Sequence, residues 1–201
     1  MAYLGTPAAT KEIINKYGFA FQKKFGQNFL IDSNILENIV SAAGITKDDF
    51  VLEIGPGIGT MTQYLCEAAK QVVAVEIDKM LIPILKDTLS EYDNVEVINE
   101  TLIYKGEISD EAKVIIKNIL LEKNVEYIHI AGADILSVKL IDYLNNIDRK
   151  DVKLSCCNNI KMCCGEGIYG SCTARFSGHR VKRFCKLQTE PRKVFEGRRF
   201  I

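Results

Sequence analysis

The chain has 201 residues, of which 47% are hydrophobic and 26% charged, and its 26 basic side chains balance 26 acidic ones. This length suits one large domain or two small ones, and the composition is typical of a soluble globular protein. No apolar run approaches the roughly 20 residues of a membrane helix, and the first residues show no basic region followed by an apolar core, so we expect a cytoplasmic protein without membrane contact.

Hydrophobic periodicity predicts an α/β protein. In chain order we expect a helix at 8–17, a helix from Ser33 as N-cap to a stop at Gly44, a strand at 50–54, a helix from about Thr60, a strand at 71–78, a helix at 79–89, a strand at 94–99, a helix at 110–123, a strand at 125–133 and a helix at 137–147. Strands that alternate with helices imply right-handed crossovers and a Rossmann-like parallel sheet. From about Lys153 the periodicity fades, with short strand candidates at 173–178 and 179–184.

The stretch "EIGPGIG" places Gly55, Gly57 and Gly59 between a buried strand and a helix. Glycines there let the backbone turn sharply and a ligand approach closely. Glu76 ends the next strand, where a carboxylate can accept both hydroxyls of a ribose. A purely structural tight turn is the alternative, but the order of strand, turn, helix, strand and acid favours nucleotide binding.

Glu53 precedes the glycines, and this E-x-G-x-G-x-G turn resembles motif I of the class I S-adenosylmethionine-dependent methyltransferases, as "VVAVEID" resembles their motif II. With "KKFGQNFLID" upstream, the part from about Thr6 to Asn99 resembles the bacterial small-subunit rRNA adenine dimethyltransferases. This resemblance implies S-adenosylmethionine as cofactor and rRNA as substrate. It further implies that Asn28 and Leu30 contact the methionine and sulfonium end, that Gly55 contacts the cofactor, and that Glu76 holds the ribose. From the residues alone, Asn28 would form an Asx-turn and Leu30 would be a core side chain.

Two parts of that family's pattern are missing. Thr101 stands where the family has an acid that contacts the cofactor's adenine ring. The N-L-P-Y tetrad, which binds and stacks on the flipped target adenine, occurs nowhere in the chain. A C-terminal helical domain that grips rRNA has no visible counterpart. The resemblance therefore implies an incomplete adenine N-methyltransferase whose catalytic residues are unknown.

Cysteines and positive charge gather in the second half of the chain. Residues 1–100 hold 8 Lys+Arg and 14 Asp+Glu, whereas residues 101–201 hold 18 and 12, and six of the seven cysteines lie within 156–185. Without an export signal such a cluster favours metal or redox chemistry over disulfides. The basic tail after Arg175 would contact RNA phosphates or form a solvated surface facing a partner subunit.

The cysteine spacing is that of a 2Fe-2S loop with one thiolate missing. Plant-type 2Fe-2S sites use C-x4-C-x2-C and a distant fourth cysteine; here Cys164, Cys172 and Cys185 fit, and Tyr169 takes the remaining place. The segment resembles the iron-sulfur end of dihydroorotate dehydrogenase electron-transfer subunits and similar oxidoreductases, which implies a 2Fe-2S cluster and an oxidoreductase partner subunit. Zinc, another metal or free thiols are the alternatives at these cysteines.

These observations predict three regions. Residues 1–100 would form an S-adenosylmethionine-binding part, 101–152 an α/β segment, and 153–201 a small Cys-rich segment. The first interpretation is a composite, chimeric chain whose methyltransferase half binds its cofactor weakly at best and has little or no turnover. Electron transfer through a 2Fe-2S centre is the alternative function, and a protein without a catalytic role is a third.

Overall fold

The structure is a computed structural model that describes residues 3–19, 32–132, 134–157, 173–175, 181–183 and 192. Its elements, in chain order, are α1 (Pro7–Lys16), α2 (Ser33–Ala43), β1 (Phe50–Ile54), α3 (Thr60–Ala68), β2 (Gln71–Glu76), α4 (Ile82–Thr88), β3 (Val95–Asn99), β4 (Ile103–Tyr104), β5 (Glu107–Ile108), α5 (Asp110–Glu122), β6 (Tyr127–Ala131), α6 (Asp134–Asn146), β7 (Lys153–Cys157), β8 (Thr173–Arg175) and β9 (Val181–Arg183). None of the helices in these ranges is long and apolar enough to cross a lipid bilayer.

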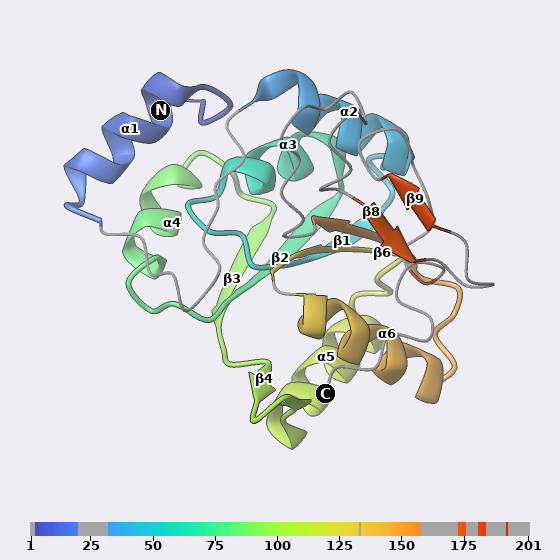
Figure 1. The fold of residues 1–201 in the computed structure, drawn as a ribbon. Coiled ribbons are helices and arrows are strands. Elements are labelled where there is room, and N and C mark those ends of the chain that lie inside the picture. Colours follow the sequence, from blue (N-terminus) through green and yellow to red (C-terminus); the bar gives the residue numbers. More distant parts are fainter. Residues whose placement is uncertain are drawn as a thin grey trace.

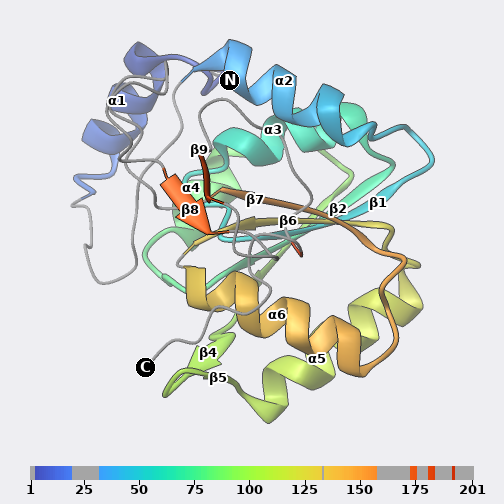
Figure 2. The same cartoon turned by 45° about the vertical axis from the view of Figure 1, so that its right-hand side comes forward.

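Five strands form one parallel sheet in the order β3-β2-β1-β6-β7. Figures 1 and 2 both show α2 and α3 on one face of this sheet and α5 and α6 on the other. Because helices cover both faces, strands such as "QVVAVE" of β2 are apolar almost throughout. The predicted α/β fold with a parallel sheet is therefore confirmed for the described residues.

Alternate side chains of each strand contribute to the two faces. Leu52 and Ile54 of β1 are buried in the cluster that includes residues of α5 and α6. Val51 lies on the other face, in a cluster with residues of α2 and α3 such as Leu36 and Leu65. Complete burial of one such side chain stabilises the fold by about 1.5–3 kcal/mol, so the central strand β1 is anchored from both sides.

The helix ends follow local chemistry, with one correction to the sequence prediction. Thr6 caps α1 through its side chain, and Pro7 occupies the first turn. Asp32, and not Ser33, is the N-cap of α2, because the Asp32 carboxylate accepts hydrogen bonds from the backbone N–H groups of Asn34 and Ile35. Gly44 ends α2 at φ 64°, as expected of a left-handed C-cap.

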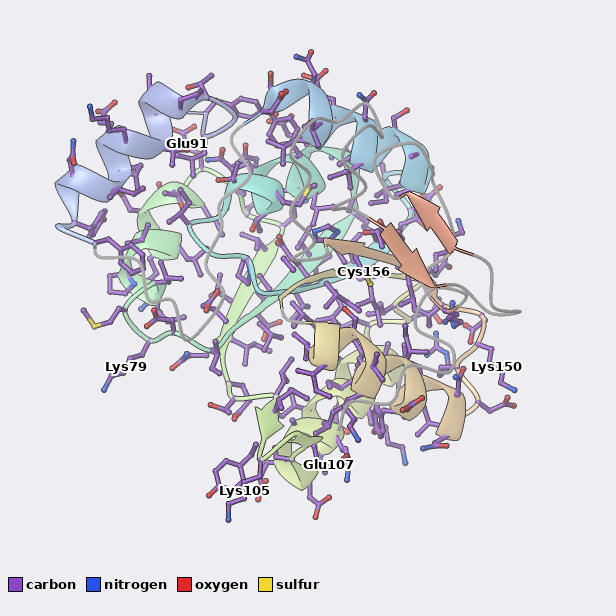
Figure 3. All side chains as sticks on the ribbon, in the orientation of Figure 1. Lys79, Glu91, Lys105, Glu107, Lys150 and Cys156 are labelled. Atoms are coloured by element: carbon purple, nitrogen blue, oxygen red, sulfur yellow. The ribbon has the colours of Figure 1, made fainter. Side chains whose placement is uncertain are left out.

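The strands after residue 100 differ from expectation in two places. β7 forms where the periodicity of "KLSCC" predicted no strand, since its pairing with β6 supplies the hydrogen bonds. The short β4–β5 hairpin was also not expected; Figure 3 shows its Lys105 and Glu107 at the bottom of the view, near the beginning of α5. The predicted strand pair near 173–184 is confirmed as β8 and β9, which pair antiparallel.

Strands from both sides of residue 100 share the main sheet. β6 pairs with β1 from Val51↔Tyr127 to Ile54↔Ile130, and β7 continues the sheet beyond β6. The C-terminal ends of β1, β2, β3 and β6 therefore meet at one edge. In open parallel sheets this edge is where ligands bind.

Candidate functional site

The glycine turn follows β1 directly at this sheet edge. Gly55, Gly57 and Gly59 all adopt positive φ angles, of 80°, 62° and 91°. A Cβ on Gly55 would overlap the carbonyl oxygen of Ala131 at the end of β6, and one on Gly59 would lie 2.9 Å from the Thr88 hydroxyl oxygen. The backbone conformation thus favours glycine at all three positions, as the sequence predicted for a sharp turn, and close packing also requires it at Gly55 and Gly59.

Glu76 lies at the end of β2 and faces this turn. Its Oε2 accepts a hydrogen bond of 3.0 Å from the backbone N–H of Gly57, and its Oε1 accepts one of 2.8 Å from the N–H of Asp78. Burial raises the pKa of the Glu76 carboxyl, and the two N–H groups offset part of that shift. The carboxylate is therefore held in one orientation beside the turn, and each oxygen keeps a further lone pair for a ligand hydroxyl.

Glu53, at the turn's N-terminal side, is the most deeply buried acid of the site. It is 1% exposed, neither carboxyl oxygen has a hydrogen-bond partner among the described residues, and burial raises its pKa to about 8. Across the sheet it pairs with His129, whose Nδ1 lies 2.6 Å from the Ser155 hydroxyl oxygen. The sequence placed Glu53 in the motif; its burial depends on helices packed over the sheet and was not predicted.

The end of β3 closes the site beside Glu76. The Asn99 side-chain amide donates a 2.7 Å hydrogen bond to the Glu76 carbonyl, and the Glu100 N–H donates one of 3.0 Å to the same oxygen. The Glu100 carboxylate accepts from the backbone N–H of Thr101. At the position where the family pattern has an acid, this chain presents the exposed Thr101.

On the other side of the turn, β6 ends at Ala131 and is followed by Gly132. Neither residue offers an amide or an aromatic side chain. The Ala131 carbonyl packs directly on Gly55. The sheet edge therefore brings together the glycine turn and Glu76, while the position after β6 lacks groups that would hold a flipped base.

Several predicted site residues lie outside the described residues: Asn28, Leu30, Cys164, Cys172 and Cys185. Among the described cysteines, Cys66 is buried on α3 and Cys156 is half-buried on β7, which Figure 3 places in the middle of the molecule. Within the described ranges no three His, Cys, Asp or Glu side chains gather as a metal site.

Fold and site together define a class. The chain is a doubly wound α/β protein with a glycine turn after the first strand and an acid after the second, at the edge where such proteins bind nucleotides. The sequence profile of the ribosomal RNA adenine dimethylase family matches residues 18–182. The chain belongs to this family.

Two curated relatives agree with that assignment, and one solved structure is similar to the chain. The chain is 65% identical to ribosomal RNA small subunit methyltransferase A of Lachnoclostridium phytofermentans over 125 residues, which are 62% of this chain and 40% of that protein. It is 48% identical to the protein of the same name from Bacillus pumilus over 62% of this chain and 43% of the relative. The crystal structure of the 23S rRNA methyltransferase ErmE is 28% identical with a TM-score of 0.46, over 65% of this chain and 48% of that one.

The chain thus spans about two fifths of the length of these curated relatives. The family match runs through Cys164 and Cys172. It therefore gives no support to a chimeric chain whose second half comes from an iron-sulfur oxidoreductase.

Proposed function

We propose that the chain binds S-adenosylmethionine at the glycine turn and derives from an enzyme that transfers methyl groups to the exocyclic amine of adenine in rRNA. The observation that carries this proposal is the contact between the Glu76 carboxylate and the N–H of Gly57. It places a fixed acceptor beside bare backbone at the end of β1, which is the arrangement that an adenosine ribose needs.

The described residues fit such a cofactor. Gly55 and Gly59 let the turn pack closely against Ala131 and Thr88, which fixes the backbone beside Glu76, and the buried Glu76 can accept both ribose hydroxyls. Asn28 and Leu30 are proposed, from the family resemblance, to hold the methionine end. S-adenosylmethionine supplies an electrophilic methyl group when bound, and Glu76 and the backbone of the turn would hold and orient it.

We propose weak or absent turnover, because the N-L-P-Y tetrad is missing and β6 ends in Ala131 and Gly132. Contact with rRNA and a cytoplasmic location belong to the same proposal and rest on the family. The regions 1–100, 101–152 and 153–201 stay a prediction. A 2Fe-2S centre with an oxidoreductase partner has no supporting observation among the described residues.

Calorimetric titration of S-adenosylmethionine into the wild type and Glu76→Gln tests cofactor binding. The Gln amide oxygen can accept from Gly57, but its NH₂ group cannot accept from Asp78 or from a ribose hydroxyl. We expect at least a tenfold loss of affinity, consistent with a buried charge-assisted hydrogen bond. Glu96→Gln, which changes an exposed acid on β3 away from the turn, is the matched control and should bind like the wild type. Equal heats from the wild type and Glu76→Gln would refute the proposal.

A further inference from the structure

The residues before position 20 form an arm that packs against Ile58 of the glycine turn. We call residues 3–19 the N-terminal arm; it contains α1. Ile58, in the middle of the turn, is completely buried in a cluster with Leu4 and Ile13 of the arm and with Leu81 and Ile84 next to and within α4. One apolar side chain therefore ties the turn to two separate segments.

A chain of buried hydrogen bonds runs parallel to this cluster. The backbone N–H of Leu4 donates to Gln63 Oε1 at 2.9 Å, and Gln63 Nε2 donates to the carbonyl of Thr88 at 2.8 Å. The Thr88 hydroxyl then donates to the carbonyl of Ile58 at 2.8 Å. Gln63 and Thr88 are each 1% exposed. We call these four residues the Gln63–Thr88 relay.

The relay ends at the part of the turn that contacts Glu76. The Ile58 carbonyl that receives the Thr88 hydroxyl belongs to the residue after Gly57, whose N–H donates to Glu76. The Thr88 hydroxyl oxygen also lies against Gly59, 2.9 Å from where a Cβ would be. A shift of the Ile58 carbonyl would therefore move the Gly57 N–H relative to the carboxylate.

We propose that Gln63 and Thr88 are positioning residues that couple the N-terminal arm to the cofactor-binding turn. Loss of the Gln63 side chain removes the partner of the Leu4 N–H and of the Thr88 carbonyl, and loss of the Thr88 hydroxyl removes a donor to the Ile58 carbonyl. Each lost buried hydrogen bond costs about a tenfold population shift. The inference rests on the proposed function for its effect on S-adenosylmethionine, but the coupling itself is a property of the protein without ligand.

Three variants separate positioning from a general loss of stability. Thr88→Val keeps the shape and removes the hydroxyl, Thr88→Ser restores the hydroxyl, and Gln63→Met keeps the length and removes both amide hydrogen bonds. Asn94→Ala is the matched control: Asn94 Nδ2 donates to the carbonyls of Cys66 and Ala69 at the far end of α3, so its loss removes similar hydrogen bonds away from the turn.

Amide hydrogen exchange of the ligand-free protein provides the readout. The N–H groups of Leu4, Gly57 and Gly59 are all hydrogen-bonded and therefore report opening at the two ends. We expect Gln63→Met to speed exchange at Gly57, whose N–H donates to Glu76 and not to Gln63, and Thr88→Val to speed exchange at Leu4, whose N–H donates to Gln63 and not to Thr88. Each effect should be about tenfold, because coupling between two sites is reciprocal. Thr88→Ser should exchange like the wild type.

The proposal is overturned if each variant accelerates exchange only at its own hydrogen-bond partner, or if Asn94→Ala accelerates Gly57 and Gly59 equally. Calorimetry adds the functional arm: S-adenosylmethionine affinity should fall about tenfold in Thr88→Val and recover in Thr88→Ser. A wild type that binds no S-adenosylmethionine would refute the proposed function and leave the exchange result to decide the coupling.

Discussion

Replacing Glu53 by Gln should change how the stability of the protein depends on pH. In the folded chain burial raises the pKa of Glu53 from 4.5 to about 8. Between these values the folded state holds a proton that the unfolded state has lost, so the free energy of unfolding falls by about 1.4 kcal/mol per pH unit. Over the whole interval Glu53 removes about 5 kcal/mol.

His129 opposes this slope at lower pH. Burial lowers its pKa from 6.5 to about 4, so the unfolded state binds the extra proton there and stability rises with pH by a similar amount per unit. The two contributions nearly cancel from pH 4.5 to 6.5. Above pH 6.5 only that of Glu53 remains, and it lowers the stability by about 2 kcal/mol up to pH 8.

Urea unfolding followed by circular dichroism at pH 5, 6, 7 and 8 measures this for wild type and Glu53→Gln. Subtracting the free energies of unfolding of the two proteins at each pH cancels the contributions of groups that titrate in both. We expect the free energy of unfolding of the variant to rise by about 4 kcal/mol relative to that of the wild type from pH 5 to 8. Glu96→Gln, which alters an exposed acid on β3, controls for net charge. Parallel curves for the wild type and Glu53→Gln would refute a neutral, buried Glu53.

Further outcomes follow from packing and from the cysteine pattern. Gly55→Ala should lower the free energy of unfolding by about 3 kcal/mol or more, measured by thermal or urea unfolding, because Gly55 has a positive φ and its Cβ would overlap the Ala131 carbonyl. Gly44→Ala has open space around its Cβ position and should cost only about 1–2 kcal/mol. Equal losses in the two variants would contradict the close approach of Gly55 to Ala131. Leu52→Ala should lower the free energy of unfolding by about 3–5 kcal/mol, whereas the side chain of Val114 is 57% exposed and Val114→Ala should lower it by less than about 0.5 kcal/mol. Similar losses in the two variants would contradict the assignment of Leu52 to the core. Anaerobic reconstitution with iron and sulfide should leave the protein without stoichiometric acid-labile sulfide, because Tyr169 offers no thiolate; a fully loaded cluster would revive the electron-transfer alternative.

The sequence predicted those parts of the site that are built locally. The glycine turn and Glu76 follow from residue type and strand order, because a parallel sheet always brings the ends of neighbouring strands to one edge. The N-cap of α2 was misassigned by one residue, since Asp32 and Ser33 are both good caps and only geometry separates them.

Contacts between distant segments were beyond sequence reasoning. The Gln63–Thr88 relay joins residues 59 and 25 positions apart in sequence, and nothing in "TQYL" or "KDTL" indicates such partners. β7 likewise owes its existence to β6, because "KLSCC" has no alternation of its own and becomes a strand through pairing. Burial of Glu53 depends on both the sheet and its covering helices, so an acid in an apolar strand was the only local signal.

In the proposed function, cofactor binding and methyl transfer would be separable, because the residues for each belong to different strands. The turn, Glu76 and the relay belong to β1, β2, α3, α4 and the N-terminal arm, all of which precede β3. The groups that would hold a target adenine belong after β6, where Ala131 and Gly132 stand. Absence of the N-L-P-Y tetrad should therefore lower the single-turnover methylation rate without weakening the binding of S-adenosylmethionine. The reason is that an interaction confined to the target base contributes to the transition state and not to cofactor affinity. A calorimetric Kd in the micromolar range together with no methylation of an rRNA fragment would fit this division, and efficient methylation would show that another group binds the base.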